Sequence, residues 1–138
     1  KKGTTMKVAI IGSRQYTNKK RIQEFVYKLK QRWGEKLEIV SGGQKDGADG
    51  YAKKYSLEFN INYEEYPPQH YNHNIHCVLD ARNYSKPYYV SNYFKRNKQI
   101  AERCDRMVAF VTDGKITNGT EHVLGCAKRL EKKYVIMD

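Results

Sequence analysis

The residues from Ser41 to Asp49 could bind a phosphate group. This segment reads Ser-Gly-Gly-Gln-Lys-Asp-Gly-Ala-Asp, and its glycines let backbone N–H groups approach a ligand where any Cβ would collide. An apolar run at 37–40 precedes the segment, and a helix-like pattern follows it. The start of that helix would add unpaired N–H donors and the positive end of its dipole. The pattern predicts an anion-binding loop, and a plain strand-to-helix turn is the alternative.

Two further segments carry residues of the same chemical kind after an apolar run. The first is Gly-Ser-Arg at 12–14, where Ser13 can donate a hydroxyl hydrogen bond and Arg14 can hold phosphate or carboxylate in a bidentate fork. The second is Thr-Asn-Gly-Thr at 117–120, where Thr120 and the N–H groups after the glycine could take a second phosphate. Three such segments predict a ligand site more strongly than one.

Five apolar runs must position these segments, and helix-like stretches separate them. The predicted strands are 6–11, 37–40, 61–66, 107–111 and 134–137. In the stretches between them, apolar residues recur every three or four positions, as on the buried face of a helix. This alternation predicts a parallel α/β sheet in three layers, with helices on both faces. Ligands of such sheets bind beyond the carboxyl ends of the strands, so we expect the three segments to converge at one edge.

The composition is typical of one domain with a strong attraction for anions. The chain has 138 residues, 39% of them hydrophobic, and a formal net charge of +11. Nucleotides, nucleic acids and acidic proteins would all be attracted to it. No apolar run approaches the ~20 residues of a membrane span, and the basic start lacks the apolar core of a signal peptide.

The cysteines indicate a reducing compartment. Cys77, Cys104 and Cys126 are an odd number and lack the spacing of a disulfide framework. Cys104 and Cys126 fall on the apolar faces of predicted helices, where they act as small core residues. We therefore expect a cytoplasmic protein.

The polar segment 67–92 has neither helical nor strand periodicity, and we expect a loop or lid there. It contains the possible metal ligands His70, His73, His76 and Cys77. Imidazole and thiolate suit zinc, but no second ligand cluster accompanies them, so a metal site is not predicted. As a lid, the segment could close over a base or a ribose through Tyr71, His73 or Arg82.

Together these segments resemble the SLOG superfamily, which includes the DprA (Smf) DNA-processing proteins and the lonely-guy cytokinin-activating enzymes. The likeness is greatest to its small, YspA-like branch. The matching residues are Gly12-Ser13-Arg14, Ser41-Gly42-Gly43, Gly47-Ala48-Asp49, Arg96-Asn97 and Gly119-Thr120. The resemblance implies one Rossmann-like domain over residues 1–138 and a pocket for a nucleotide or nucleotide-derived ligand such as ADP-ribose. It also implies a homo-oligomer, and we expect no separate cofactor.

The site implied by the motifs and the resemblance is large. Its candidate ligand-binding residues are Gly12, Ser13, Arg14, Ser41, Gly42, Gly43, Gly47, Ala48, Asp49, Arg96, Asn97, Thr117, Asn118, Gly119, Thr120 and Glu121. Asp49 could hold a ribose hydroxyl, or it could simply be an acid favoured by the dipole at a helix start.

A catalytic role is less well supported than binding. The lonely-guy enzymes cleave the N-glycosidic bond of nucleoside monophosphates with an arginine, which Arg96 matches, and a glutamate. Val123 stands where that glutamate belongs, and valine can neither stabilise an oxocarbenium ion nor activate water. Glu121 would point elsewhere on a helix, and Asp113 and His122 are the other possible acids or bases. Despite this mismatch, Arg96 and Glu121 are the candidate catalytic residues.

Three functions therefore stay open. The first, which we favour, is a binding protein or sensor for a nucleotide-derived ligand. The second is a phosphoribohydrolase-like enzyme with rearranged catalytic acids. The third is a DprA-like binder of single-stranded DNA, which the charge of +11 and the 12 tyrosines favour. No aromatic pair has a spacing that demands base stacking, which argues against the third.

Overall fold

A computed structural model describes residues 5–13, 15–42, 47–66 and 90–138 of the chain. Its strands are β1 (Met6–Gly12), β2 (Leu37–Ser41), β3 (Asn62–Glu65), β4 (Arg106–Phe110) and β5 (Lys133–Met137). Its helices are α1 (Lys19–Trp33), α2 (Gly47–Glu58), α3 (Val90–Arg103) and α4 (Asn118–Arg129), with a short 3-10 helix, η1 (Gly34–Lys36).

The five strands form one sheet in the order β3-β2-β1-β4-β5, and every neighbouring pair is parallel. In the register of the central strand, Val8 lies between Ile39 of β2 and Arg106 of β4. The predicted parallel α/β sheet is confirmed. Because the strand order reverses beside β1, the connections after β1 and β4 diverge at this point, where sheets of this kind bind ligands.

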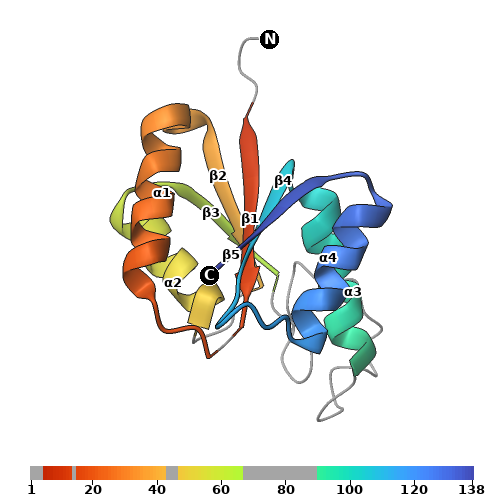
Figure 1. Cartoon of the computed structure of the whole chain (residues 1–138). Helices are drawn as coiled ribbons and strands as arrows, with labels where there is room; N and C mark the ends of the chain where they lie inside the picture. Colours follow the sequence, from red (N-terminus) through yellow and green to blue (C-terminus); the bar gives the residue numbers. More distant parts are fainter. Residues whose placement is uncertain (1–4, 14, 43–46, 67–89) are drawn as a thin grey trace, which may run out of the picture.

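Helices cover both faces of the sheet, with α1 and α2 on one side and α3 and α4 on the other (Figure 1). Alternate residues of a strand point to opposite faces. Val8 and Ile10 therefore pack toward α1 and α2, while Ala9 and Ile11 pack toward α3 and α4. Burial on both faces explains why the central strands are continuous apolar runs.

Local signals fix the ends of two helices. The side chain of Asn18 caps α1 by accepting a hydrogen bond from the Arg21 N–H at 3.3 Å. Gly34 ends α1 with φ of 59°, a conformation that glycine adopts without strain. Thr117 caps α4 by accepting a bond from the Thr120 N–H at 3.4 Å. None of the described helices has the length and apolar character of a membrane span.

Helix α3 begins earlier than its sequence pattern suggests. Its first turn contains Val90, Ser91 and Asn92, which we had assigned to the polar segment 67–92. That boundary was wrong, because the apolar spacing that marks the helix starts only in its later turns. The rest of the proposed lid, with Tyr71 and Arg82, lies outside the described residues.

Candidate functional site

The loop after β1 is joined to the start of α2 and to the end of β4. The Ser13 carbonyl accepts the N–H groups of Tyr16 at 3.1 Å and Ala48 at 3.2 Å, and the Ser13 N–H donates to the Phe110 carbonyl at 3.2 Å. Gly12 is needed for this close approach, since a Cβ there would collide with the Phe110 carbonyl. Two of the predicted segments thus meet at the carboxyl edge of the sheet.

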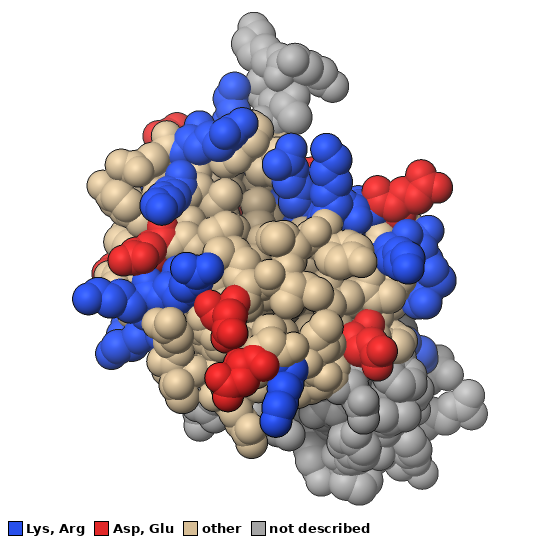
Figure 2. All heavy atoms as spheres, in the orientation of Figure 1, with Lys and Arg blue, Asp and Glu red and all other residues tan. Residues whose placement is uncertain are grey.

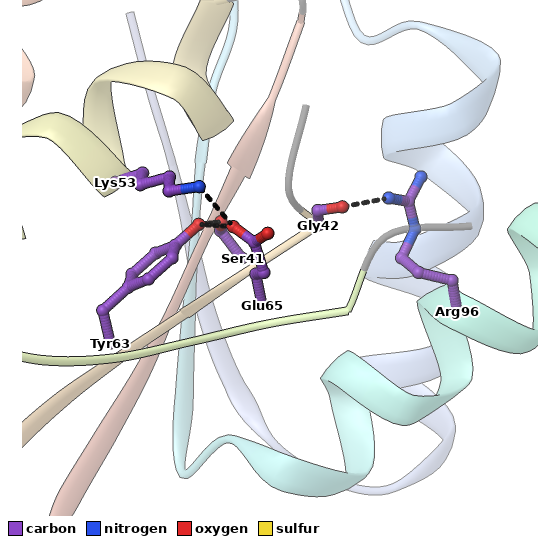
Figure 3. Close-up of polar contacts among 6 residues, drawn as sticks. All are labelled: Ser41, Gly42, Lys53, Tyr63, Glu65 and Arg96. Carbon is purple, nitrogen blue, oxygen red and sulfur yellow. Dashed lines mark hydrogen bonds and ion pairs between the residues drawn. The ribbon is translucent and has the colours of Figure 1, made fainter. Parts of the chain in front are cut away.

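Gly42 makes room for two buried charged side chains. A Cβ on this residue would lie 2.7 Å from Oδ2 of Asp49 and would also collide with the guanidinium of Arg96. Arg96 also donates from Nη1 to the Gly42 carbonyl at 3.0 Å (Figure 3). The absence of a side chain at Gly42 is therefore explained by the protein's own packing. The side chains of Asp49 and Arg96 therefore pack against Gly42, directly after the end of β2.

A polar relay runs from this arginine to α4. Arg96 Nε donates to Oδ1 of Asn97 at 2.9 Å, and Asn97 Nδ2 lies 3.1 Å from Nδ1 of His122. Because Oδ1 of Asn97 already accepts a bond, its amide NH₂ faces the imidazole, and His122 Nδ1 must accept. The network therefore assigns the His122 proton to Nε2. Arg96, Asn97 and His122 connect the glycine segment to α4.

The electrostatics of His122 agree with this assignment. Burial, and after it the charge of Arg129, lower the pKa of His122 below its ordinary 6.5. His122 Nδ1 also lies 3.9 Å from Sγ of Cys126, which accepts a bond from Arg129 Nη2 at 3.3 Å. The neutral imidazole is thus the favoured form at neutral pH.

A second polar cluster lies beside Gly42 and was missed in the sequence. Ser41 Oγ lies 2.5 Å from the Tyr63 hydroxyl, which donates to Oε1 of Glu65 at 3.1 Å, and Lys53 Nζ lies 3.3 Å from the same oxygen (Figure 3). Because a phenol has one proton, the Ser41 hydroxyl donates to Tyr63. The only sequence signal was the two-residue spacing of Tyr63 and Glu65 on one strand.

This cluster constrains the role of Ser41. The side chain is fully buried and its hydroxyl is directed at Tyr63, although we had predicted contact with a ligand. Burial, more than any other influence, raises the pKa of Tyr63 well above its ordinary value, so the phenol stays protonated. The cluster therefore fixes the end of β2 against β3.

The start of α4 presents backbone N–H groups of the kind that bind a phosphate. The Thr117 hydroxyl caps the Thr120 N–H, and the Thr117 carbonyl accepts the Glu121 N–H at 2.8 Å. The N–H groups of Asn118 and Gly119 also belong to this first turn, and such groups have no partner within their own helix. A Cβ added at Gly119 would meet no atom within 4 Å among the described residues, so the space in front is open.

The remaining predicted residues divide into two groups. Val123 is buried in the core between α4 and the sheet, Glu121 is exposed at the start of α4, and the Asp113 N–H bonds to Oδ1 of Asp138 at 3.2 Å. Arg14, Gly43, His70, His73, His76 and Cys77 lie outside the described residues. In the part of the chain that is described, no group of three or more His, Cys, Asp or Glu side chains could hold a metal ion.

A protein-family model matches the first half of the chain. The model, YAcAr, is described as "YspA, cpYpsA-related SLOG family" and matches residues 6–73, which run from β1 past β3. This chain belongs to the SLOG superfamily. The matched part of the SLOG chain includes the glycine segment, so the resemblance found in the motifs is confirmed. Among proteins with curated descriptions, none matches the sequence.

Solved structures share the fold of this SLOG chain. One is the molybdenum cofactor carrier protein from Chlamydomonas reinhardtii, with 13% identity and a TM-score of 0.63. Another is the molybdenum cofactor binding protein from the phototrophic bacterium Rippkaea orientalis, with 17% identity and a TM-score of 0.66. Each comparison covers 96% of this chain and 76% of the other. At these identities the likeness shows the fold.

One expectation is corrected by these structures. We had expected no cofactor and considered a metal unlikely for a chain of this kind. The proteins just named are described as a cofactor carrier and a cofactor-binding protein. The expectation of no cofactor was therefore wrong, because the same phosphate-type donors serve nucleotides and cofactors alike.

Proposed function

We propose that this SLOG protein binds and carries a small phosphate-bearing ligand at the carboxyl edge of its sheet. The observation that carries the proposal is the start of α4, where a Cβ added at Gly119 would meet no atom within 4 Å among the described residues. The N-terminus of a helix favours anions through its unpaired donors and its dipole. The switch in strand order beside β1 supports the same location.

The ligand that we propose first is nucleotide-derived, of the ADP-ribose or NAD-derived type. The β1 loop and the start of α2, which Ser13 joins, would bind a second part of such a ligand. Asp49 and Arg96 would position the neighbouring glycine segment, because both side chains pack against Gly42. Cys104 and Cys126 are buried free thiols, which supports a reducing, cytoplasmic location.

The molybdenum cofactor is the second candidate ligand, because the structures sharing the fold are described as carrying or binding it. Its pterin part ends in a phosphate, which suits the N–H donors of Asn118 and Gly119. The N–H groups at the start of α4 would hold this cofactor through its organic part. When bound, the cofactor would be cargo whose chemistry is used elsewhere.

Two other functions have weaker support. A phosphoribohydrolase needs a carboxylate at the sugar, yet Val123 is packed in the core and Arg96 donates to Gly42 and Asn97. A single-stranded DNA binder would use the net charge of +11. Its affinity would fall steeply with salt, which distinguishes it from a small-ligand carrier.

A thermal-shift panel tests the proposal. It compares AMP, ADP, ADP-ribose, NAD and the molybdenum cofactor, and chromatography then identifies the recovered ligand. Binding raises the melting temperature once the ligand exceeds its dissociation constant. We expect a shift with at least one of these compounds and recovery of that compound unchanged. Release of a free base would establish the hydrolase, and the absence of any shift would refute the small-ligand site.

A further inference from the structure

His122 links the two parts of the proposed ligand site. It is three residues beyond Gly119 in α4, and residues at this spacing share one face of a helix. Its Nδ1 lies 3.1 Å from Nδ2 of Asn97 on α3, and Asn97 in turn accepts a bond from Arg96. The last contact, from Arg96 Nη1 to the Gly42 carbonyl, is 3.0 Å (Figure 3). One series of contacts therefore connects the start of α4 to the residue directly after β2.

The donors and acceptors in this series match only when His122 is neutral. An arginine is always a donor, and the Nε of Arg96 donates to Oδ1 of Asn97 at 2.9 Å. The Asn97 amide then has its NH₂ group for His122. A neutral imidazole accepts this bond at Nδ1, whereas an imidazolium carries a proton on both nitrogens. A proton on His122 therefore places two donors against each other.

Rotation of the Asn97 amide does not remove this conflict. It would turn Oδ1 toward His122, but it would also turn the NH₂ group toward Arg96, which cannot give up its proton. Another candidate acceptor, Sγ of Cys126, lies 3.9 Å from the imidazole, but a thiol accepts weakly and this one already takes a bond from Arg129. One of the two contacts of Asn97 must therefore break, and either loss removes support from Arg96.

We propose that His122 positions Gly42 for the ligand through Asn97 and Arg96, and that a proton on His122 loosens Gly42 and releases the ligand. This inference rests on the proposed function, because it assigns the release of the ligand to that same site. His122 is a positioning residue, since its effect passes through two other side chains. The ligand is held at neutral pH and released on acidification.

The groups around His122 agree with a change below neutral pH. Those that face it are Cys126 and Arg129 on α4 and, through Asn97, Arg96 on α3. The strands β4 and β5, which also pack against α4, begin with Arg106 and Lys133 at the opposite edge of the sheet. Burial, and after it the charge of Arg129, lower the pKa of His122 below its ordinary 6.5. The neutral form that the contacts require is thus complete at neutral pH.

NMR of the isotope-labelled full chain tests the inference without any ligand. We expect the amide signal of Gly42 to shift between pH 8 and pH 5 with the same midpoint as the imidazole signals of His122. His122→Gln keeps an acceptor for Asn97 but cannot titrate, so its Gly42 signal should stay at the neutral position. A wild-type Gly42 signal that does not follow His122, or one that shifts equally in His122→Gln, would overturn the inference.

Asn97→Asp gives a second test of the same contacts. A carboxylate oxygen can accept from Arg96 and from the imidazolium at once, so protonation would no longer break the series. The His122 pKa should therefore rise above its wild-type value, and the Gly42 signal should stop following it. An unchanged His122 titration in this variant would contradict the arrangement of donors that we assign.

Acid also titrates other groups, so ligand binding must be compared in a matched variant. Asp and Glu side chains lie on several parts of the surface (Figure 2), and the other histidines of the chain are His70, His73 and His76. His122→Gln keeps all of these groups and removes only the proton site in the series. The difference between this variant and the wild type therefore isolates His122.

Calorimetric titration with ADP-ribose then measures the release. The phosphates of this probe take up no proton between pH 5 and 8, so the probe itself stays the same. Where the NMR titration shows His122 protonated, wild-type affinity should be about fivefold or more below its value at pH 7.5, and His122→Gln should lose less. Tighter wild-type binding in acid would place His122 directly on the phosphate, and equal losses in both proteins would also contradict the inference. Failure of ADP-ribose to bind at either pH would count against the proposed ligand, while the NMR titration would still decide the role of His122.

Discussion

Arg96 illustrates how a residue of catalytic type can serve the structure. It is buried, and it donates to the Gly42 carbonyl and to Oδ1 of Asn97. Through Asn97 it also determines which nitrogen of His122 carries the proton. Loss of ligand binding in an Arg96 variant would therefore reflect a displaced glycine segment as readily as a lost ligand contact.

The first prediction concerns the stability that Arg96 provides. Arg96→Met leaves a buried carbonyl and a buried amide oxygen without their donor, which should cost about 2–4 kcal/mol of unfolding free energy in urea titration. Arg103 on the same helix is the matched control. It pairs with Glu64 at 2.8 Å on the surface, so Arg103→Met should cost less than about 1 kcal/mol. Equal losses for both variants would contradict the role assigned to Arg96.

The second prediction concerns His122 and pH. Its pKa is lowered in the folded chain, so the unfolded chain takes up the proton first as the pH falls. The stability that comes from the neutral imidazole is complete above pH 6.5 and is lost as the pH falls through the folded-state pKa. Melting temperatures between pH 5 and 8 should decline toward acid less steeply in His122→Gln than in the wild type. Identical pH profiles would show that the relay does not hold the neutral form.

At the scale of elements, the cap of α4 links stability to the site. Thr117 caps the helix whose first turn faces the open space at Gly119. Asn18 caps α1, whose described residues belong to no part of the proposed ligand site. The two caps are therefore a matched pair, one expected to affect binding and one not.

The third prediction compares these caps. Thr117→Ala and Asn18→Ala should each lower the unfolding free energy by about 1 kcal/mol, measured in urea. Only Thr117→Ala should also weaken ligand binding, because fraying of α4 disorders the N–H donors of Asn118 and Gly119. If Asn18→Ala weakens binding as much, the effect comes from general destabilisation and the site is not at α4.

The elements themselves could be predicted because parallel strands and amphipathic helices leave strong apolar patterns. All five strands lie where those patterns indicated, with ends shifted by a residue or so. The first turn of α3 was missed, since Ser91 and Asn92 are polar. The cluster of Ser41 with Tyr63 was also missed, because it depends on the register of β2 with β3, which the sequence does not display. The internal support of Gly42 by Asp49 and Arg96 needed coordinates for the same reason.

At the scale of the whole molecule, the charge of the chain suits the proposed ligand. The proposed site lies beyond the carboxyl ends of β1, β2 and β4, where the strand order reverses. The net charge of +11 favours anionic ligands there.

The measurement that tests the account most directly is calorimetric titration of two glycine variants in α4 with the ligand that stabilises the wild type. Gly119→Ala places a methyl group in the open space where we locate the phosphate, whereas Gly125→Ala contacts only Arg129, at 3.6 Å. The methyl group would displace the phosphate from the N–H donors of this turn. We therefore expect Gly119→Ala to weaken binding by about 10- to 100-fold, the effect of losing a hydrogen bond to a charged group. Gly125→Ala should bind as the wild type does. Unchanged affinity in a folded Gly119→Ala protein would contradict a phosphate site at the start of α4.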